Sequence, residues 1–110
     1  MSTMSDVQTV TANTRTANIL AGKPFEFAAQ PSIINIYIVG AAAGLHADVL
    51  IGGESIMSDE EVSAANRFPV TNEDLTARHG ANAGDRIFIA LRNTTGAAIV
   101  GRTLVEVLPL

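Results

Sequence analysis

The residues of this chain best suited to chemistry are His46 and Asp48, which stand two apart in the segment Leu45 to Ile51. Successive side chains of a strand alternate between faces, so residues two apart share one face. A histidine beside a carboxylate can act as a general base, or the two side chains can both bind a metal ion. A metal site needs further ligands, and His79 is the only other histidine. We therefore interpret the pair as the polar side of an outer strand, and we expect neither a metal site nor a bound cofactor.

Two further stretches invite comparison with known binding loops. Asp59-Glu60-Glu61 lacks the central glycine of a calcium-binding loop. Gly52-Gly53-Glu54 lacks the surrounding residues of a phosphate-binding loop, and a turn or bulge explains it more simply. The serine elbow of hydrolases, GxSxG, is also absent from the sequence. The sequence thus predicts no catalytic residue, and the chain is not expected to be an enzyme.

Composition narrows the classes of partner. The chain has 110 residues, 47% of them hydrophobic, which is enough for the core of one domain, and it has no cysteine for thiol chemistry or disulfides. The net charge is −4 and the basic residues are scattered, so no nucleic-acid surface is predicted. The longest nearly apolar run, Ile33 to Leu45, is too short and interrupted to cross a membrane. The first residues, MSTMSDVQTV, do not resemble a signal peptide.

Alternating apolar residues predict the strands that must position these side chains. Arg86–Arg92 and Ile99–Leu108 flank the polar turn Asn93–Gly96, which predicts an antiparallel hairpin. In Ser32–Gly40, one stripe is fully apolar and predicts a central strand, whereas the other contains Asn35 and a partly exposed Tyr37. The apolar stripe consists of Ile34, Ile36 and Ile38.

Shorter strand signals stand before and after this central strand. In Leu45–Ile51, alternate residues from Leu45 onward are expected to point inward, and His46, Asp48 and Leu50 outward. Glu54–Met57 can continue that strand beyond the two glycines. Phe25-Glu26-Phe27 is predicted as a short strand with both rings on one face.

The only helix-start signal lies at Ser58-Asp59-Glu60-Glu61. Ser58 and Glu61 have the spacing of a capping box, and the helix could continue to Asn66 before Phe68-Pro69 stops it. A second short helical or turn segment is expected at Thr71 to Arg78. Residues 58–84 are therefore predicted to form the longest irregular connection.

These elements predict an all-β fold: an antiparallel β-sandwich or jelly-roll-like single domain with one short helix, with a small closed barrel as the alternative. Residues 1–22 are predicted as a flexible N-terminal arm and residues 23–110 as the β-sandwich domain. The arm has the composition to add a strand to a neighbouring subunit.

From Phe25 to Leu108 the chain resembles the small β-sandwich proteins of bacteriophage virions: capsid, minor capsid and decoration (cement) proteins. The resemblance lies in an Ala/Asn/Thr/Gly-rich chain without Cys or Trp, a polar N-terminal arm and an ending in Leu108-Pro109-Leu110. It implies a virion structural protein, made in the host cytoplasm, whose partners are further copies of itself, for example in a trimer, and a major capsid protein. The arm is nearly neutral, unlike the basic arms that line a genome, which favours an outer or stabilising position.

The alternative function is a small ligand- or carbohydrate-binding accessory module. Sugar-binding modules expose several aromatic platforms, and this chain has one tyrosine, four phenylalanines and no tryptophan. The terminal run Leu104–Leu110 favours assembly, because it is apolar on both faces of its strand. Leu104, Leu108 and Leu110 then need a cover besides the domain's own core. The N-terminal arm of the same subunit or a neighbouring subunit could provide it. We expect a neighbouring subunit, with residues 1–20 and 58–84 forming most contacts between chains.

Overall fold

The structure, a computed structural model, describes residues 2–71 and 73–110, and within them the fold is all-β with no helix. The all-β prediction is therefore confirmed. The strands are β1 (Ser2–Val10), β2 (Ser32–Gly40), β3 (Leu45–Ile51), β4 (Glu54–Glu61), β5 (Ser63–Ala64), β6 (Leu75–Ala81), β7 (Ile87–Asn93) and β8 (Ile99–Pro109).

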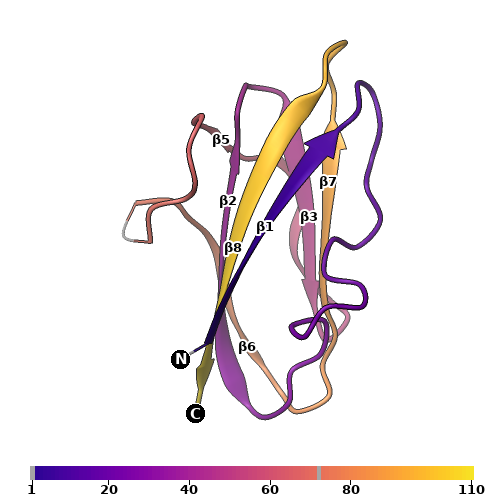
Figure 1. Ribbon diagram of the computed structural model, residues 1–110. Helices are drawn as coiled ribbons and strands as arrows, with labels where there is room; N and C mark the ends of the chain where they lie inside the picture. The colour runs from indigo at the N-terminus through magenta and orange to yellow at the C-terminus, as the bar shows by residue number, and fades with distance from the viewer. Residues whose placement is uncertain (1, 72) are drawn as a thin grey trace.

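The strands form two sheets that lie face to face (Figure 1). Sheet A has the order β1-β8-β2, and β2 then pairs with β6 along most of its length and with the short β5 at its end. Sheet B has the order β4-β3-β7. All pairings are antiparallel except that of β2 with β5. The first and last strands of the chain thus pair with each other in sheet A.

The segment 14–28 extends sheet B beyond β7 without forming a regular strand. Thr16 N–H donates to the carbonyl of Leu91 at 2.8 Å, and Ile19 N–H donates to Ile89 at 2.9 Å. Further along, Ile87 N–H donates to the carbonyl of Glu26 at 2.7 Å. Residues 20–25 loop away between these contacts, so the segment is an interrupted fourth strand that covers the edge of β7.

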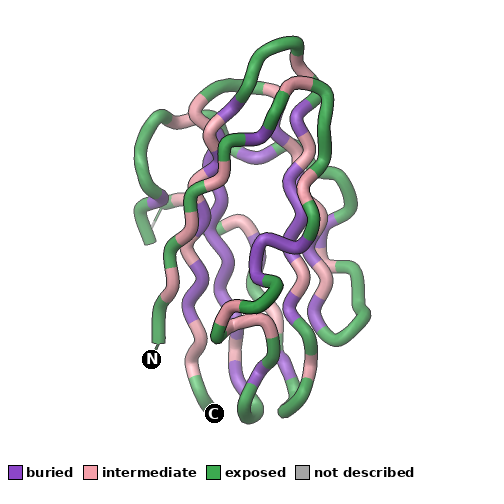
Figure 2. Tube along the Cα trace, turned by 45° about the vertical axis from the view of Figure 1, so that its right-hand side comes forward, coloured by how far each residue is buried: buried purple, intermediate pink, exposed green. Residues whose placement is uncertain are grey.

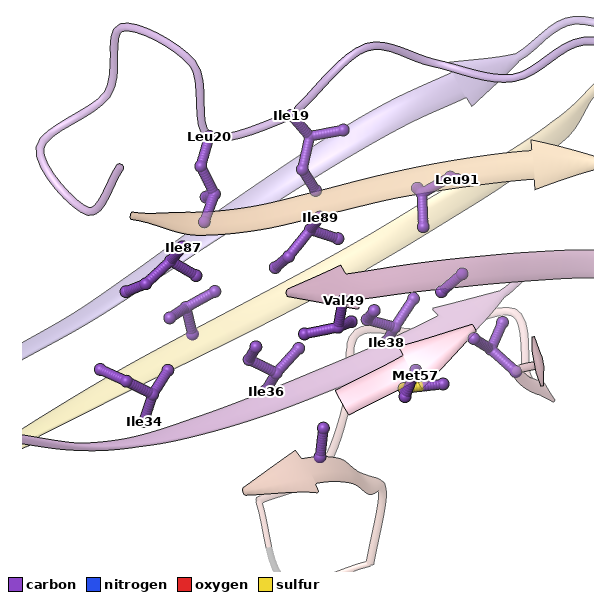
Figure 3. Close-up of a cluster of buried hydrophobic side chains, with 14 of the residues drawn as sticks. Ile19, Leu20, Ile34, Ile36, Ile38, Val49, Met57, Ile87, Ile89 and Leu91 are labelled. Carbon is purple, nitrogen blue, oxygen red and sulfur yellow. The ribbon is translucent and has the colours of Figure 1, made fainter. Parts of the chain in front are cut away.

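The core lies between the two inner faces (Figure 3). Ile34, Ile36 and Ile38 are each 1% exposed or less, which confirms the predicted apolar stripe of β2. Sheet B and the segment 14–28 contribute the other side. Its buried members are Leu45, Ala47, Val49, Ile51, Met57, Ile87, Ile89, Leu91, Ile19, Leu20 and Ala28.

Gly52 and Gly53 form the turn of the hairpin between β3 and β4. Their φ angles are +61° and +85°, which L-residues with a side chain rarely adopt, and Ile51 pairs directly with Glu54 across the turn. The predicted continuation of the strand beyond the glycines is thus a second strand folded back on β3.

The predicted hairpin between the last two long strands is wrong. Both strands exist, but β7 belongs to sheet B and β8 to sheet A, so the turn after Asn93 carries the chain from one sheet to the other. The Asn93 amide stabilises this crossing, because its Nδ2 donates to the carbonyls of Val10 (3.0 Å) and Ala97 (2.7 Å). Alternation identified each strand but contained no information about its partner.

The predicted short helix at Ser58 is also wrong, because these residues form the end of β4. Glu60 and Glu61 pair with Ala47 and His46 on β3. Only a few residues separate Ser58 from Pro69, so a helix there would gain few hydrogen bonds after a costly nucleation. Pairing with β3 satisfies the same backbone groups against a strand that is already in place.

Four other expectations need correction or relocation. The 58–84 stretch is not one long irregular connection, since it contains the end of β4 and the whole of β5 and β6. The segment Thr71–Arg78 is predicted as helical or turn, but its part from Leu75 onward is strand, and residue 72 lies outside the described residues. Phe25–Phe27 forms no strand: it makes one isolated bridge, from Phe27 to Arg86. Most of the predicted arm of residues 1–22 lies in β1 and in the segment along β7.

Candidate functional site

The two sheets turn very different outer faces to their surroundings. Directly opposite residues of antiparallel strands place their side chains on the same face, so the register assigns each residue to one face. We call the side of sheet A that carries Asn35 and Glu106 the outer face of sheet A. The side of sheet B that carries His46 and Arg92 is the outer face of sheet B.

The outer face of sheet B carries charged side chains that are paired with one another, beside the apolar Leu50, Phe88 and Ala90. Arg15 donates to Asp48 at 2.9 Å, and Arg92 donates to Asp59 at 2.6 Å. The Asp59 N–H donates to Oδ1 of Asp48 at 2.7 Å, which joins the two pairs into one network. The hydrogen bond from Arg92 lowers the pKa of the Asp59 carboxyl below its usual value. This arrangement neutralises its own charges and suits a face exposed to solvent.

The structure places His46 and Asp48 on this face, as expected, but it does not join them. The Asp48 carboxylate is engaged by Arg15 and by the Asp59 N–H, whereas His46 Nδ1 is buried and has no hydrogen-bond partner among the described residues. His79 lies on β6 of the other sheet, where its Nε2 is 3.2 Å from Glu54. The described residues contain no group of three or more His, Cys, Asp or Glu side chains that could hold a metal ion.

The acidic and glycine-rich stretches have structural partners too. Glu61 Oε2 accepts a hydrogen bond from the Gly44 N–H at 3.1 Å, next to the connection between β2 and β3. Gly52 N–H donates to the carbonyl of Arg86 at 2.9 Å, which ties the turn to the start of β7.

The outer face of sheet A is rich in apolar side chains. Val7 on β1 is 50% exposed and Leu75 on β6 is 49% exposed. The connection between β5 and β6 adds Phe68, whose ring lies 5.7 Å from the guanidinium of Arg102 on β8. Exposed or half-buried apolar residues of this face and its adjoining loop are Val7, Ile33, Phe68, Val70, Leu75, Leu104 and Leu108.

A buried polar cluster lies among these apolar residues. The Tyr37 hydroxyl donates to Oε1 of Glu106 at 2.6 Å, and Asn35 Nδ2 approaches the same oxygen at 3.4 Å. All three residues are less than 9% exposed, and Asn35 Oδ1 has no hydrogen-bond partner in the part of the chain that the structure describes. The sequence interpretation treated Tyr37 as partly exposed and missed the cluster. Its signal was Glu106, the one charge in an otherwise apolar terminal run.

A pocket of about 200 Å³ lies near the start of β1, lined mainly by apolar groups that include Phe25, Phe27 and Val107. Ligand sites for drug-sized molecules usually enclose about 300–1,000 Å³. Two phenylalanines lie close together here, although not on a strand. The pocket is small for a sugar or cofactor and carries no charged side chain.

Comparison of the chain with models of known protein families, with curated proteins and with solved structures finds no match. The described residues include no helix of the length and apolarity needed to cross a membrane.

Proposed function

We propose that this protein is a virion structural protein, a capsid decoration or minor capsid protein of a bacteriophage that stabilises a shell through subunit contacts. Its partners are further copies of itself and a major capsid protein. The observation that carries the proposal is the contrast between the outer faces: charged side chains on sheet B are paired with one another, whereas sheet A exposes the large apolar side chains of Val7 and Leu75. Exposed apolar side chains grouped on one side of a small domain are typical of a protein contact.

The order of the strands supports a jelly-roll fold. Sheet A reads β1-β8-β2-β6, and sheet B, with the segment 14–28 included, reads 14–28, β7, β3, β4. The strands can be renumbered 1 to 8 along the chain if the segment 14–28 is counted as strand 2 and the short β5 is omitted. In this numbering, sheet A has the order 1-8-3-6 and sheet B has the order 2-7-4-5. This is the order of a jelly roll, an architecture used by viral capsid domains and by lectins. Fold alone does not decide function.

The test uses two matched leucines. Leu104 on β8 and Leu50 on β3 are both half-buried and point outward, one from sheet A and one from sheet B. Tagged wild-type, Leu104→Asp and Leu50→Asp proteins are produced in infected host cells, and phage particles are purified by density gradient. We expect the wild type and Leu50→Asp in the particles, and Leu104→Asp only in the soluble fraction. Circular dichroism checks that both variants fold. Wild-type protein absent from purified particles would overturn the proposal.

The alternative, a carbohydrate-binding accessory module, is favoured by the pocket beside Phe27, which is 54% exposed. A glycan array with wild-type and Phe27→Ala proteins separates the two functions. Binding that depends on Phe27 would support the alternative, and no binding is expected for a shell component.

A further inference from the structure

β1 presents a long, regular edge that no other described segment covers. All nine of its residues pair with β8 in unbroken register, from Ser2 with Val107 to Val10 with Ile99. In an antiparallel strand, every second residue directs its N–H and C=O away from the partner. On that far side, no backbone hydrogen bond joins residues 2–9 to any described residue. Figure 2 shows β1, which starts at N, at the margin of the molecule.

The other edges of the two sheets are protected. β4 carries register shifts and a run of acidic residues, and Asp59 within it has a φ of +51°. The segment 14–28 covers β7. β6 has a register shift opposite Ile36/Tyr37 and carries Arg78 and His79. Bulges, charges and covering segments are the usual means by which proteins prevent edge-to-edge pairing.

β1 has only one of these protections, a charged residue that points to the core side of its sheet. It contains no proline and no bulge, and its one charged residue, Asp6, is already engaged by the side chains of Lys23 and Gln8. An edge of this length and regularity is a template for another strand.

We propose that β1 pairs antiparallel with β1 of a second copy of this chain, about a two-fold axis at Val7. An axis perpendicular to the sheet keeps the outer faces of both copies on the same side. Odd residues of one copy must then lie opposite odd residues of the other. The axis therefore passes midway between the two copies of one residue, and not between two successive residues. The pairing requires only the β1 edge. It goes beyond the proposed function and does not depend on the virion assignment.

Side-chain chemistry selects Val7 as the centre. This register places Val7 opposite Val7 and Asp6 opposite Gln8 of the second copy. It also places hydroxyl opposite hydroxyl (Ser5 with Thr9) and apolar opposite apolar (Met4 with Val10). Matched cross-strand pairs of this kind stabilise a sheet.

Neighbouring centres are poorly matched. A centre at Asp6 places two carboxylates opposite each other, which is destabilising. Centres at Ser5 and Gln8 place Asp6 opposite Met4 and Val10, respectively. In the Val7 register the two A sheets become one continuous sheet, and their apolar outer faces form a single surface of twice the size.

The first experiment is sedimentation velocity over a range of protein concentrations. The wild type is expected to be a dimer or a multiple of a dimer. Val7→Lys places two ammonium groups at the axis and should give monomers with unchanged β-sheet circular dichroism. Phe27→Lys is the control, because Phe27 is similarly exposed, 54% against 50%, but lies outside β1 and outside the outer face of sheet A. A monomeric wild type at high concentration would overturn the pairing.

Cross-linking keeps the proposal testable if Val7→Lys fails to fold. The chain has no cysteine, so Val7→Cys introduces a single thiol. Directly opposite residues have Cβ atoms about 4.5–5.5 Å apart, close to disulfide range. Val7→Cys should therefore oxidise to a covalent dimer much faster than Thr3→Cys, which shares its strand and face but meets residue 11 of the second copy. Equal rates would contradict the register.

Different experimental results would overturn the virion function and the β1 pairing. A dimer that is absent from phage particles would overturn the virion function and leave the pairing intact. A monomer that is present in the particles would do the reverse.

Discussion

The Tyr37 hydroxyl donates a 2.6 Å hydrogen bond to Glu106 across two neighbouring strands of sheet A, on the face that is turned away from the core. Burial, the hydrogen bond and the negative charge of Glu106 together raise the pKa of Tyr37 to about 12, and Arg78 opposes them weakly. A buried acid–base pair on an outer face is unusual, since outer faces normally leave such groups in water. It marks this region as packed more tightly than a solvent-exposed surface requires.

This pKa predicts how stability depends on alkaline pH. The neutral hydroxyl is favoured in the folded state, so its contribution is complete below the unfolded pKa of about 10 and is lost as pH rises to about 12. The loss should approach at most about 1.4 kcal/mol per pH unit. Urea unfolding of wild type and Tyr37→Phe between pH 9 and 12 measures it, and the variant should lack this slope.

The same pKa can be observed directly, because Tyr37 is the only tyrosine. Tyrosinate absorbance near 295 nm should titrate with a midpoint near 12. In Glu106→Gln the midpoint should fall but stay above 10, since burial is the largest cause and remains. A wild-type midpoint near 10 would show that Tyr37 is solvated.

On the outer face of sheet B, Arg92 is predicted to control the titration of Asp59. The hydrogen bond from Arg92 lowers the pKa of Asp59, so the pair contributes to stability above the usual carboxyl pKa and is lost as pH falls through the lowered value. In Arg92→Gln, the pKa of Asp59 measured by NMR should rise towards its ordinary value. Arg86→Gln is the control, because Arg86 pairs with Glu26 instead. No change in Arg92→Gln would contradict the network.

The core stripe of β2 predicts that the stability lost when a side chain is truncated depends strongly on whether that side chain faces the core. Ile36→Ala should lower the free energy of unfolding by about 2–5 kcal/mol, because the removed atoms are fully buried and leave a cavity. Leu50→Ala, half-buried and outward on β3, should cost clearly less. Denaturant unfolding measures both, and equal costs would mean that the faces are assigned wrongly.

Asn93 is predicted to be essential to the crossing between the sheets. Asn93→Ala leaves the carbonyl of Val10 without its donor and removes the bonds that its Oδ1 accepts from Thr95. An unsatisfied buried polar group costs about 1–3 kcal/mol. Asn82→Ala, in an exposed turn, should change the free energy of unfolding by less than about 0.5 kcal/mol. If thermal unfolding gives the two variants the same stability, the crossing does not depend on the amide.

The sequence by itself determined the strands with clear alternation and their inward faces. Alternation depends only on the two-residue period of a strand, so Ile34, Ile36 and Ile38, and likewise Leu45, Ala47 and Val49, could be assigned to the core without a structure. The two glycines also predicted a turn, because few other residues adopt positive φ at low cost.

Only the tertiary structure decided which strands pair. β7 and β8 are neighbours in sequence with a turn between them, yet they lie in different sheets, and β8 pairs instead with β1 and β2. Pairing with another strand also explains why Asp59 to Glu61 belong to β4. An edge of β3 was available to them, and a short helix would have formed fewer hydrogen bonds. The Tyr37–Glu106 contact, between residues far apart in sequence, arises from strand pairing as well. A local pattern specifies which face of a strand is apolar, but the partner depends on the backbone edges that the rest of the chain presents.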